Sequence, residues 1–151
     1  MSVTPRPTIT GSYLMPSLDH AAVSDVMRPG VLACDPESPL TEVARMMSTR
    51  HVHCVLVMQA SDEGSEPAVW GMVSDLDLVR TSLRTGPETS AAACAQRPVL
   101  SVDSTTPLRE AASIMGMNRV SHMLVTDPGT QRPTGVLSTL DVAGAIAWGE
   151  A

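Results

Sequence analysis

The feature that most constrains this chain is a seven-residue pattern that it contains twice. Residues 71–77 read Gly-Met-Val-Ser-Asp-Leu-Asp, and residues 135–141 read Gly-Val-Leu-Ser-Thr-Leu-Asp. In each copy, two apolar residues lead to a serine that is followed three residues later by aspartate, which is typical of a strand running directly into a capped helix. Two such turns indicate an internal repeat, and a repeat of this period excludes an ordinary single α/β domain.

The sequence upstream of the two turns repeats as well. Residues 31–35 correspond to residues 99–103, and residues 38–44 correspond to residues 106–112, at a constant offset of 68 residues. The offset falls to 64 at the two turns, because the loop at residues 127–134 is four residues shorter than its counterpart. Length differences of this kind belong in surface loops, so the chain reads as two copies of one pattern.

Each copy carries the order β-α-β-β-α. In the first copy, apolar runs predict strands at residues 31–34, 52–58 and 69–73. One helix is predicted to begin with Ser38 as N-cap and Pro39 in its first turn, and another directly follows the third strand. The fold class is therefore α/β. Because each copy is too small to bury its own sheet, we expect the two to pack sheet to sheet with pseudo-two-fold symmetry.

The composition along the chain predicts the domain boundaries. Residues 1–18 contain three prolines among several Ser and Thr residues, so we expect a flexible N-terminal arm. The first repeat then takes residues 19–88 and begins with one or two helical turns at residues 19–27. The second repeat takes residues 89–148.

Charge and composition exclude several classes of function. The net charge is −6, all ten basic residues are arginines without a basic cluster, and aromatic residues make up 2%, which argues against nucleic-acid and anionic membrane partners. No apolar run approaches the roughly 20 residues of a membrane span, and the N-terminus lacks a signal peptide pattern. The odd number of cysteines (Cys34, Cys54 and Cys94) indicates a reducing compartment, hence a cytoplasmic location.

The order of these elements resembles the cystathionine β-synthase (CBS) domain, and two in tandem resemble a CBS pair, or Bateman module. The resemblance rests on the duplicated G-h-h-S-x-x-D turn, on Asp25-Val26-Met27 and on residues 73–78, and it covers roughly 125 of the 151 residues. It implies a regulatory module that binds AMP, ADP, ATP or S-adenosylmethionine in clefts between the repeats. It further implies a homodimer that relays ligand binding to an unknown partner protein. The sequence patterns indicate no other domain, so the chain looks like a stand-alone CBS-pair protein.

The resemblance assigns roles to the two turns. Asp77 and Asp141 would bind the ribose, and Ser74 and Ser138 would bind the phosphate. A helix N-terminus has free N–H groups and a partial positive charge, both of which suit phosphate. The residues alone equally support a helix cap that needs no ligand. Because the strand at residues 54–58, beside the first turn, departs from the family pattern, we expect the second turn to be the better ligand site.

Basic side chains lie near the second strand of each repeat. By resemblance, His53, His122 and Arg119 would reach ligand phosphates, whereas His51 is expected to be a solvated residue at a helix end. The alternative for the first three is a solvated or hydrogen-bonded structural role. Because the repeats offer different groups here, we expect two inequivalent clefts.

An adenine slot is also implied, and ordinary core strands explain the same residues equally well. It would be lined by Val31, Ala33 and Val99.

Two other classes of function stay open. The chain could be a ligand-free dimeric scaffold, or it could hold a metal at His51, His53 and Cys54, with His122 or Cys34. Successive strand residues face opposite sides, so Cys54 does not share a face with His51 and His53, and we expect no metal site. We also expect no enzyme, since no nucleophile and base are visible together, and no cofactor beyond a regulatory nucleotide.

Overall fold

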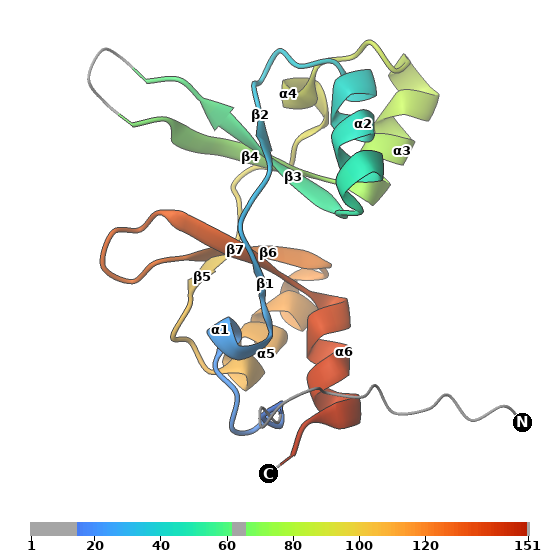
Figure 1. Cartoon of the computed structure of the whole chain (residues 1–151). Coiled ribbons are helices and arrows are strands. Elements are labelled where there is room, and N and C mark those ends of the chain that lie inside the picture. Colours follow the sequence, from blue (N-terminus) through green and yellow to red (C-terminus); the bar gives the residue numbers. More distant parts are fainter. Residues whose placement is uncertain (1–14, 62–65, 151) are drawn as a thin grey trace, which may run out of the picture. The chain divides into compact units, whose positions relative to one another are not determined.

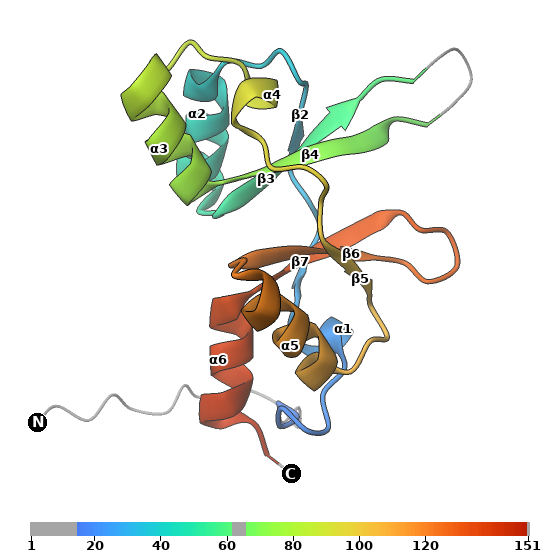
Figure 2. The same cartoon turned by 180° about the vertical axis from the view of Figure 1, so that it is seen from behind.

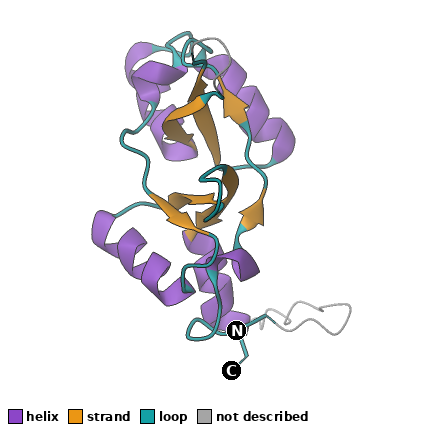
Figure 3. Cartoon of the chain, turned by 90° about the vertical axis from the view of Figure 1, so that its left-hand side faces the viewer, coloured by secondary structure: helices purple, strands orange, loops and turns teal. Residues whose placement is uncertain are grey.

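The computed structural model describes residues 15–61 and 66–150, so most of the predicted arm at residues 1–18 lies outside the described residues. The fold is mixed α/β, as predicted, and each repeat has a β-α-β-β-α-like order of elements (Figure 1). The helices of each repeat lie on one face of its sheet (Figure 3).

The chain divides into two compact units whose boundaries differ from those of the sequence repeats. The middle unit is Gly30–Leu100, and the terminal unit combines the described part of Met1–Pro29 with residues 101–150. The segment before the first strand of each repeat therefore belongs to the unit that holds the other repeat. We call it the exchanged segment. No local pattern in the sequence indicates the exchange, because it depends on contacts between residues far apart in the chain.

The middle unit is built on a three-stranded sheet of order β2-β3-β4, in which β2 runs parallel and β4 antiparallel to β3. Its strands are β2 (Ala33–Cys34), β3 (Cys54–Gln59) and β4 (Ala68–Ser74). Its helices are α2 (Leu40–Arg50), α3 (Asp75–Thr85) and the short α4 (Ala91–Cys94). Figure 2 shows α4 on this unit, close to β4.

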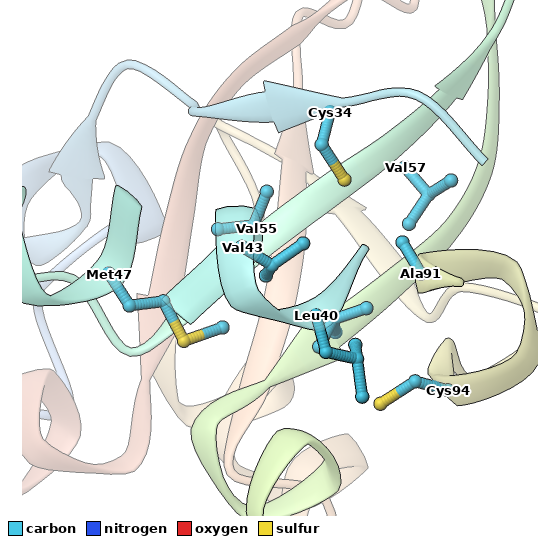
Figure 4. Close-up of a cluster of buried hydrophobic side chains, with 9 residues drawn as sticks. Cys34, Leu40, Val43, Met47, Val55, Val57, Ala91 and Cys94 are labelled. Atoms are coloured by element: carbon cyan, nitrogen blue, oxygen red, sulfur yellow. The ribbon is translucent and has the colours of Figure 1, made fainter. Parts of the chain in front are cut away.

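The core of the middle unit lies between α2 and the sheet. Leu40, Val43 and Met47 are buried at the spacing of one helix face. They pack with buried residues of the three strands and α4, which are Cys34, Val55, Val57, Val73, Ala91 and Cys94 (Figure 4). Burying one large aliphatic side chain stabilises a fold by about 1.5–3 kcal/mol, so this cluster anchors the unit.

The terminal unit repeats this plan on a four-stranded sheet of order β1-β7-β6-β5. Its strands are β1 (Arg28–Pro29), β5 (Ser101–Asp103), β6 (His122–Thr126) and β7 (Pro133–Ser138). Its helices are α1 (Val23–Val26), α5 (Leu108–Asn118) and α6 (Thr139–Trp148). The buried face of α5 consists of Leu108, Ala111 and Met115, which are the counterparts of Leu40, Val43 and Met47 at the offset of 68.

Both ends of the described chain meet in the terminal unit. The Ser17 backbone N–H donates to the carbonyl of Glu150 over 3.0 Å, and the Glu150 N–H donates to the carbonyl of Met15 over 2.9 Å. An ion pair between Arg109 and Asp19 ties the same segment to α5. Residues 15–17 of the predicted arm are thus hydrogen-bonded to the last described residue.

The predicted start of α2 is wrong by one residue. Pro39 is the N-cap, with an extended ψ of 151°, and the helix begins at Leu40. The Leu40 N–H donates to the carbonyl of Thr89 over 2.9 Å, so a distant backbone oxygen replaces the expected Ser38 cap. The buried Ser38 hydroxyl instead accepts from the Asp35 N–H at 3.1 Å.

Three elements are also shorter in the structure than the sequence pattern predicts. The first strands shrink to Ala33–Cys34 and Ser101–Asp103, and the first helical turns shrink to Val23–Val26. These strands lie at sheet edges, where only one neighbour supplies ladder hydrogen bonds.

The glycines of the duplicated pattern are required by the exchanged segments. A Cβ at Gly135 would lie 2.5 Å from the carbonyl oxygen of Arg28 in β1, and a Cβ at Gly71 would lie 2.9 Å from the Cβ of Ala95. Each segment therefore passes directly over the glycine of the unit that holds it. The pattern keeps glycine because a side chain would push this segment away.

Gly135→Ala is expected to destabilise the protein by about 1–3 kcal/mol, because the Arg28 carbonyl is backbone and yields only if β1 shifts. Gly144→Ala is the matched control. Gly144 lies within α6 with no atom within 4 Å of an added Cβ, so this variant should gain up to about 1 kcal/mol from helix propensity. Urea unfolding followed by circular dichroism measures both, and equal effects of the two substitutions would contradict the close approach.

Candidate functional site: the two strand-to-helix turns

The turn of the middle unit joins β4 directly to α3. Ser74 is the N-cap of α3, and its hydroxyl accepts from the Asp77 N–H at 3.1 Å. In return, the Ser74 N–H donates to Oδ2 of Asp77 at 3.0 Å. This reciprocal pair is a capping box, so the helix cap expected from the S-x-x-D pattern is present.

The turn of the terminal unit joins β7 to α6 in the same way. The Ser138 hydroxyl accepts from the Asp141 N–H at 3.2 Å, and the Ser138 N–H donates to Oδ2 of Asp141 at 2.8 Å. All four predicted turn residues are half-buried. The predicted pair Ser138 and Asp141 therefore matches Ser74 and Asp77 in secondary structure, hydrogen bonding and burial.

The two aspartates differ at their second carboxylate oxygen. Oδ1 of Asp77 accepts from Nε2 of Gln96 at 3.0 Å. Within residues 15–61 and 66–150, Oδ1 of Asp141 accepts no hydrogen bond. Our sequence reasoning missed both Gln96 and α4. The signal was present, because Ser90 before an Ala-rich run is an N-cap pattern and the offset of 68 continues upstream to Val23.

Predicted basic residues lie beside both turns. Nδ1 of His53 is 2.9 Å from Oδ2 of Asp75, the residue after Ser74, and both side chains are more than half exposed (62% and 53%). His122 stands opposite Ser138 in the β6–β7 register, and its Nδ1 is 2.9 Å from the Ser121 hydroxyl. The first repeat thus offers a histidine–carboxylate pair where the second offers a histidine–hydroxyl pair.

Two further residues from the sequence analysis lie at the C-terminal ends of helices. His51 and Arg119 are the C-caps of α2 and α5, both in the left-handed conformation with φ near 53° and 54°. Their equivalence in the repeat is therefore structural, since each ends the helix that leads into the second strand. Both side chains are exposed.

The residues predicted for an adenine slot lie on or just before the first strands. Val31 and Val99 are half-buried, and Ala33 is exposed in β2. Their role in binding adenine stays a prediction.

The structure also bears on the metal alternative and on membranes. In the described part of the chain, no three His, Cys, Asp or Glu side chains lie together as metal ligands. Cys54 is buried at the start of β3, whereas His53, just before the strand, is exposed. Among the helices of the described residues, none has the length and apolar character of a membrane span.

All three cysteines are free and buried. Burial raises the pKa of the Cys34 thiol to about 11, with the negative charges of Asp35 and Glu42 adding to the effect. Burial likewise raises the pKa of Cys94. Protonated thiols are poor nucleophiles and poor metal ligands, so Cys34 and Cys94 serve as core residues.

Cys34 should make the stability of the protein fall at high pH. In the unfolded chain the thiol ionises near its ordinary pKa of about 9, whereas in the folded state it keeps its proton up to about 11. The stabilising contribution is fully present below pH 9 and is lost as pH rises through 11. Urea unfolding at pH 8 and pH 10.5 should therefore show a smaller loss in Cys34→Ala than in the wild type.

The control for this experiment is Val43→Ala, which also opens a cavity in the same core but removes no ionisable group. Its loss of stability between the two pH values should equal that of the wild type. If Cys34→Ala and Val43→Ala lose stability equally with pH, the thiol does not carry the effect.

Comparison with known protein families identifies the duplicated pattern. The model of the CBS domain matches the chain twice, at residues 23–84 and at residues 91–147. Each match ends within or beside the helix that follows one of the two turns. No curated protein sequence matches the chain.

Several solved structures share the fold. An uncharacterized conserved protein from Pyrococcus horikoshii has a TM-score of 0.72 at 22% identity, over 84% of this chain and 92% of that one. The CBS domain protein PAE2072 from Pyrobaculum aerophilum, complexed with AMP, has a TM-score of 0.68 at 22% identity, over 84% and 98%.

The CBS domain pair of protein MJ0100, in complex with 5-methylthioadenosine and S-adenosyl-L-methionine, has a TM-score of 0.71 at 14% identity, over 84% of this chain and 96% of that one. At these identities, the three likenesses show a common fold and nothing finer.

Proposed function

The chain belongs to the CBS domain family, and from that premise we propose that it is a regulatory module that binds an adenosine-containing ligand and relays its presence to a partner protein. The observation that carries the proposal is the pair of strand-to-helix turns, each with a serine and an aspartate at a helix N-terminus. AMP, ADP, ATP and S-adenosylmethionine are the candidate ligands.

The geometry of each turn suits the two polar parts of such a ligand. The N-terminus of a long helix carries a partial positive charge that favours phosphate or carboxylate. In α3 the first three N–H groups already donate within the protein, to the His53 carbonyl, to Oδ1 of Asp75 and to the Ser74 hydroxyl. The carboxylate three residues later accepts hydrogen bonds only, as a ribose diol requires. His122 beside Ser138 and His53 beside Asp75 add groups that are cationic when protonated.

Two solved relatives support the ligand class. One CBS domain protein is complexed with AMP, and another binds 5-methylthioadenosine and S-adenosyl-L-methionine. Adenosine is the part that these ligands share. The proposal assigns regulation, not catalysis, to the protein, and the three free, buried thiols support a reducing, cytoplasmic location.

Thermal unfolding tests the ligand proposal. At a concentration of about 100 times its dissociation constant, a bound ligand adds about 2.7 kcal/mol to the free energy of unfolding. At least one of AMP, ADP, ATP and S-adenosylmethionine should therefore raise the melting temperature, and Asp77→Ala combined with Asp141→Ala should abolish the rise.

Asp25→Ala is the matched control, because Asp25 makes the same bond to its N-cap backbone, Ala22 N–H to Oδ2 at 2.8 Å, but on the short α1. The ligand response should survive this change. Flat responses to all four compounds in the wild type would favour the ligand-free scaffold instead.

A homodimer is the second part of the proposal. Leu76, Val79 and Leu83 follow one another along α3 at the spacing of one helix face, with exposures of 53%, 49% and 84%. On α6, Leu140 and Ile146 are 74% and 66% exposed. An exposed apolar face of this kind is typical of a protein–protein contact, and a second copy of the chain is the partner that we propose.

Leu83→Glu should weaken this dimer without unfolding the chain, because its side chain is 84% exposed and makes little contribution to the core. Sedimentation analysis should show a larger monomer fraction, by tenfold or more in dissociation constant for a loss of about 1.4 kcal/mol. Ser48→Glu, which adds the same charge at an exposed position of α2, is the control. An unchanged dimer in Leu83→Glu would exclude the α3 face.

A further inference from the structure

The capping boxes of the two turns are alike, but the second oxygen of the aspartate has different surroundings in each. Both carboxylates accept from the N–H of their own serine through Oδ2, at 3.0 Å in Asp77 and 2.8 Å in Asp141. Only Asp77 also accepts a side-chain amide, from Gln96 at 3.0 Å. Both aspartates are half-buried, so burial does not distinguish them.

Gln96 is held in place by the strand beneath it. Its backbone N–H donates to the carbonyl of Met72 at 2.9 Å, and its carbonyl accepts from the Met72 N–H at 3.2 Å. The next residue is fixed as well, because Nε of Arg97 donates to the Trp70 carbonyl at 2.7 Å and its guanidinium lies 4.0 Å from the centre of the Trp70 ring. The backbone of Gln96 is therefore held beside Met72, within reach of Asp77, while the side chain itself is exposed.

The terminal unit has a different residue at the same place. Arg28 pairs with Val136, which precedes Ser138 by two residues, just as Gln96 bridges Met72, which precedes Ser74 by two. Arg28 and Gln96 thus occupy equivalent positions of the exchanged segments. Because arginine is always cationic, the terminal unit offers a positive charge where the middle unit offers a neutral amide.

We propose that the Gln96 amide competes with ribose for the Asp77 carboxylate, so that the turn at Asp141 is the one that binds ribose and the turn at Asp77 binds it only weakly. The inference rests on the proposed function. A vicinal diol bound by a carboxylate gives one hydroxyl to each oxygen. Each carboxylate oxygen has two acceptor positions. At Asp141 no described residue donates to Oδ1, so both of its positions are open to a hydroxyl, whereas at Asp77 the Gln96 amide takes one of them and competes with the hydroxyl.

Gln96 is therefore a specificity-determining residue that makes a duplicated motif serve as one ribose site.

Calorimetric titration of the full chain with AMP tests the inference. Asp141→Asn keeps a carbonyl oxygen for the Ser138 N–H but replaces the open acceptor by a donor, so the helix cap survives while ribose binding is lost. We expect at least about tenfold weaker binding in Asp141→Asn and a change below about twofold in Asp77→Asn.

Gln96→Ala supplies the reverse test. Added to Asp141→Asn, it should restore AMP binding by about threefold or more by opening Asp77, and adding Asp77→Asn should remove this gain. Equal losses in Asp77→Asn and Asp141→Asn, or no gain from Gln96→Ala, would overturn the inference while leaving the proposed function intact. Binding in Gln96→Ala but not in the wild type would show that the turn at Asp141 does not bind ribose and would overturn the inference.

A second measurement needs no ligand. In a double-mutant cycle of Gln96→Ala and Asp77→Ala, followed by urea unfolding, the two changes should couple by about threefold or more in the unfolding equilibrium constant, because alanine leaves no partner for the Gln96 amide. Absence of coupling would show that the amide does not occupy the carboxylate and would overturn the inference. Coupling without AMP binding by any variant would instead count against the proposed function.

Discussion

The contact on which the rest of this structure depends is the passage of an exchanged segment over the glycine of each motif strand. At Gly135 the backbone of β1 comes so close that an added Cβ would lie 2.5 Å from a carbonyl oxygen. This approach adds an antiparallel neighbour to β7 and brings Arg28 near the start of α6. The same approach at Gly71 brings in Gln96. The capping boxes and the core then complete two units, each of which contains a segment of the other repeat.

Much of this was readable from the sequence, because it depends on local periodicity. The helix faces at Leu40 and Leu108, the buried strands, the duplicated turns and the paired helix ends at His51 and Arg119 all follow from patterns a few residues long. The exact start of α2 did not follow, because the carbonyl of Thr89 caps it from 49 residues away. Similarly, the bond from Gln96 to Asp77 joins residues 19 apart through an unforeseen segment, and no local rule indicates it.

The site shows why a repeated motif does not imply repeated function. Ser74 and Asp77 satisfy every requirement that Ser138 and Asp141 satisfy, including the reciprocal hydrogen bonds. The side-chain bond by which each aspartate caps its helix uses one carboxylate oxygen. The contacts of the other oxygen depend on the residues around it. Those residues belong to the exchanged segment that pairs with the strand. A single residue outside the motif can therefore change which groups the second oxygen of the aspartate is able to bind.

The pairing of residues 15–17 with Glu150 has an architectural consequence. The two backbone bonds, at 3.0 and 2.9 Å, place the entry and the exit of the described chain at one point of the terminal unit. This module could therefore be inserted into a surface loop of a host polypeptide, because the point where the described chain enters it lies next to the point where the chain leaves it. The same closeness would permit circular permutation, with the old ends joined by a short linker and new ends opened in a hairpin loop.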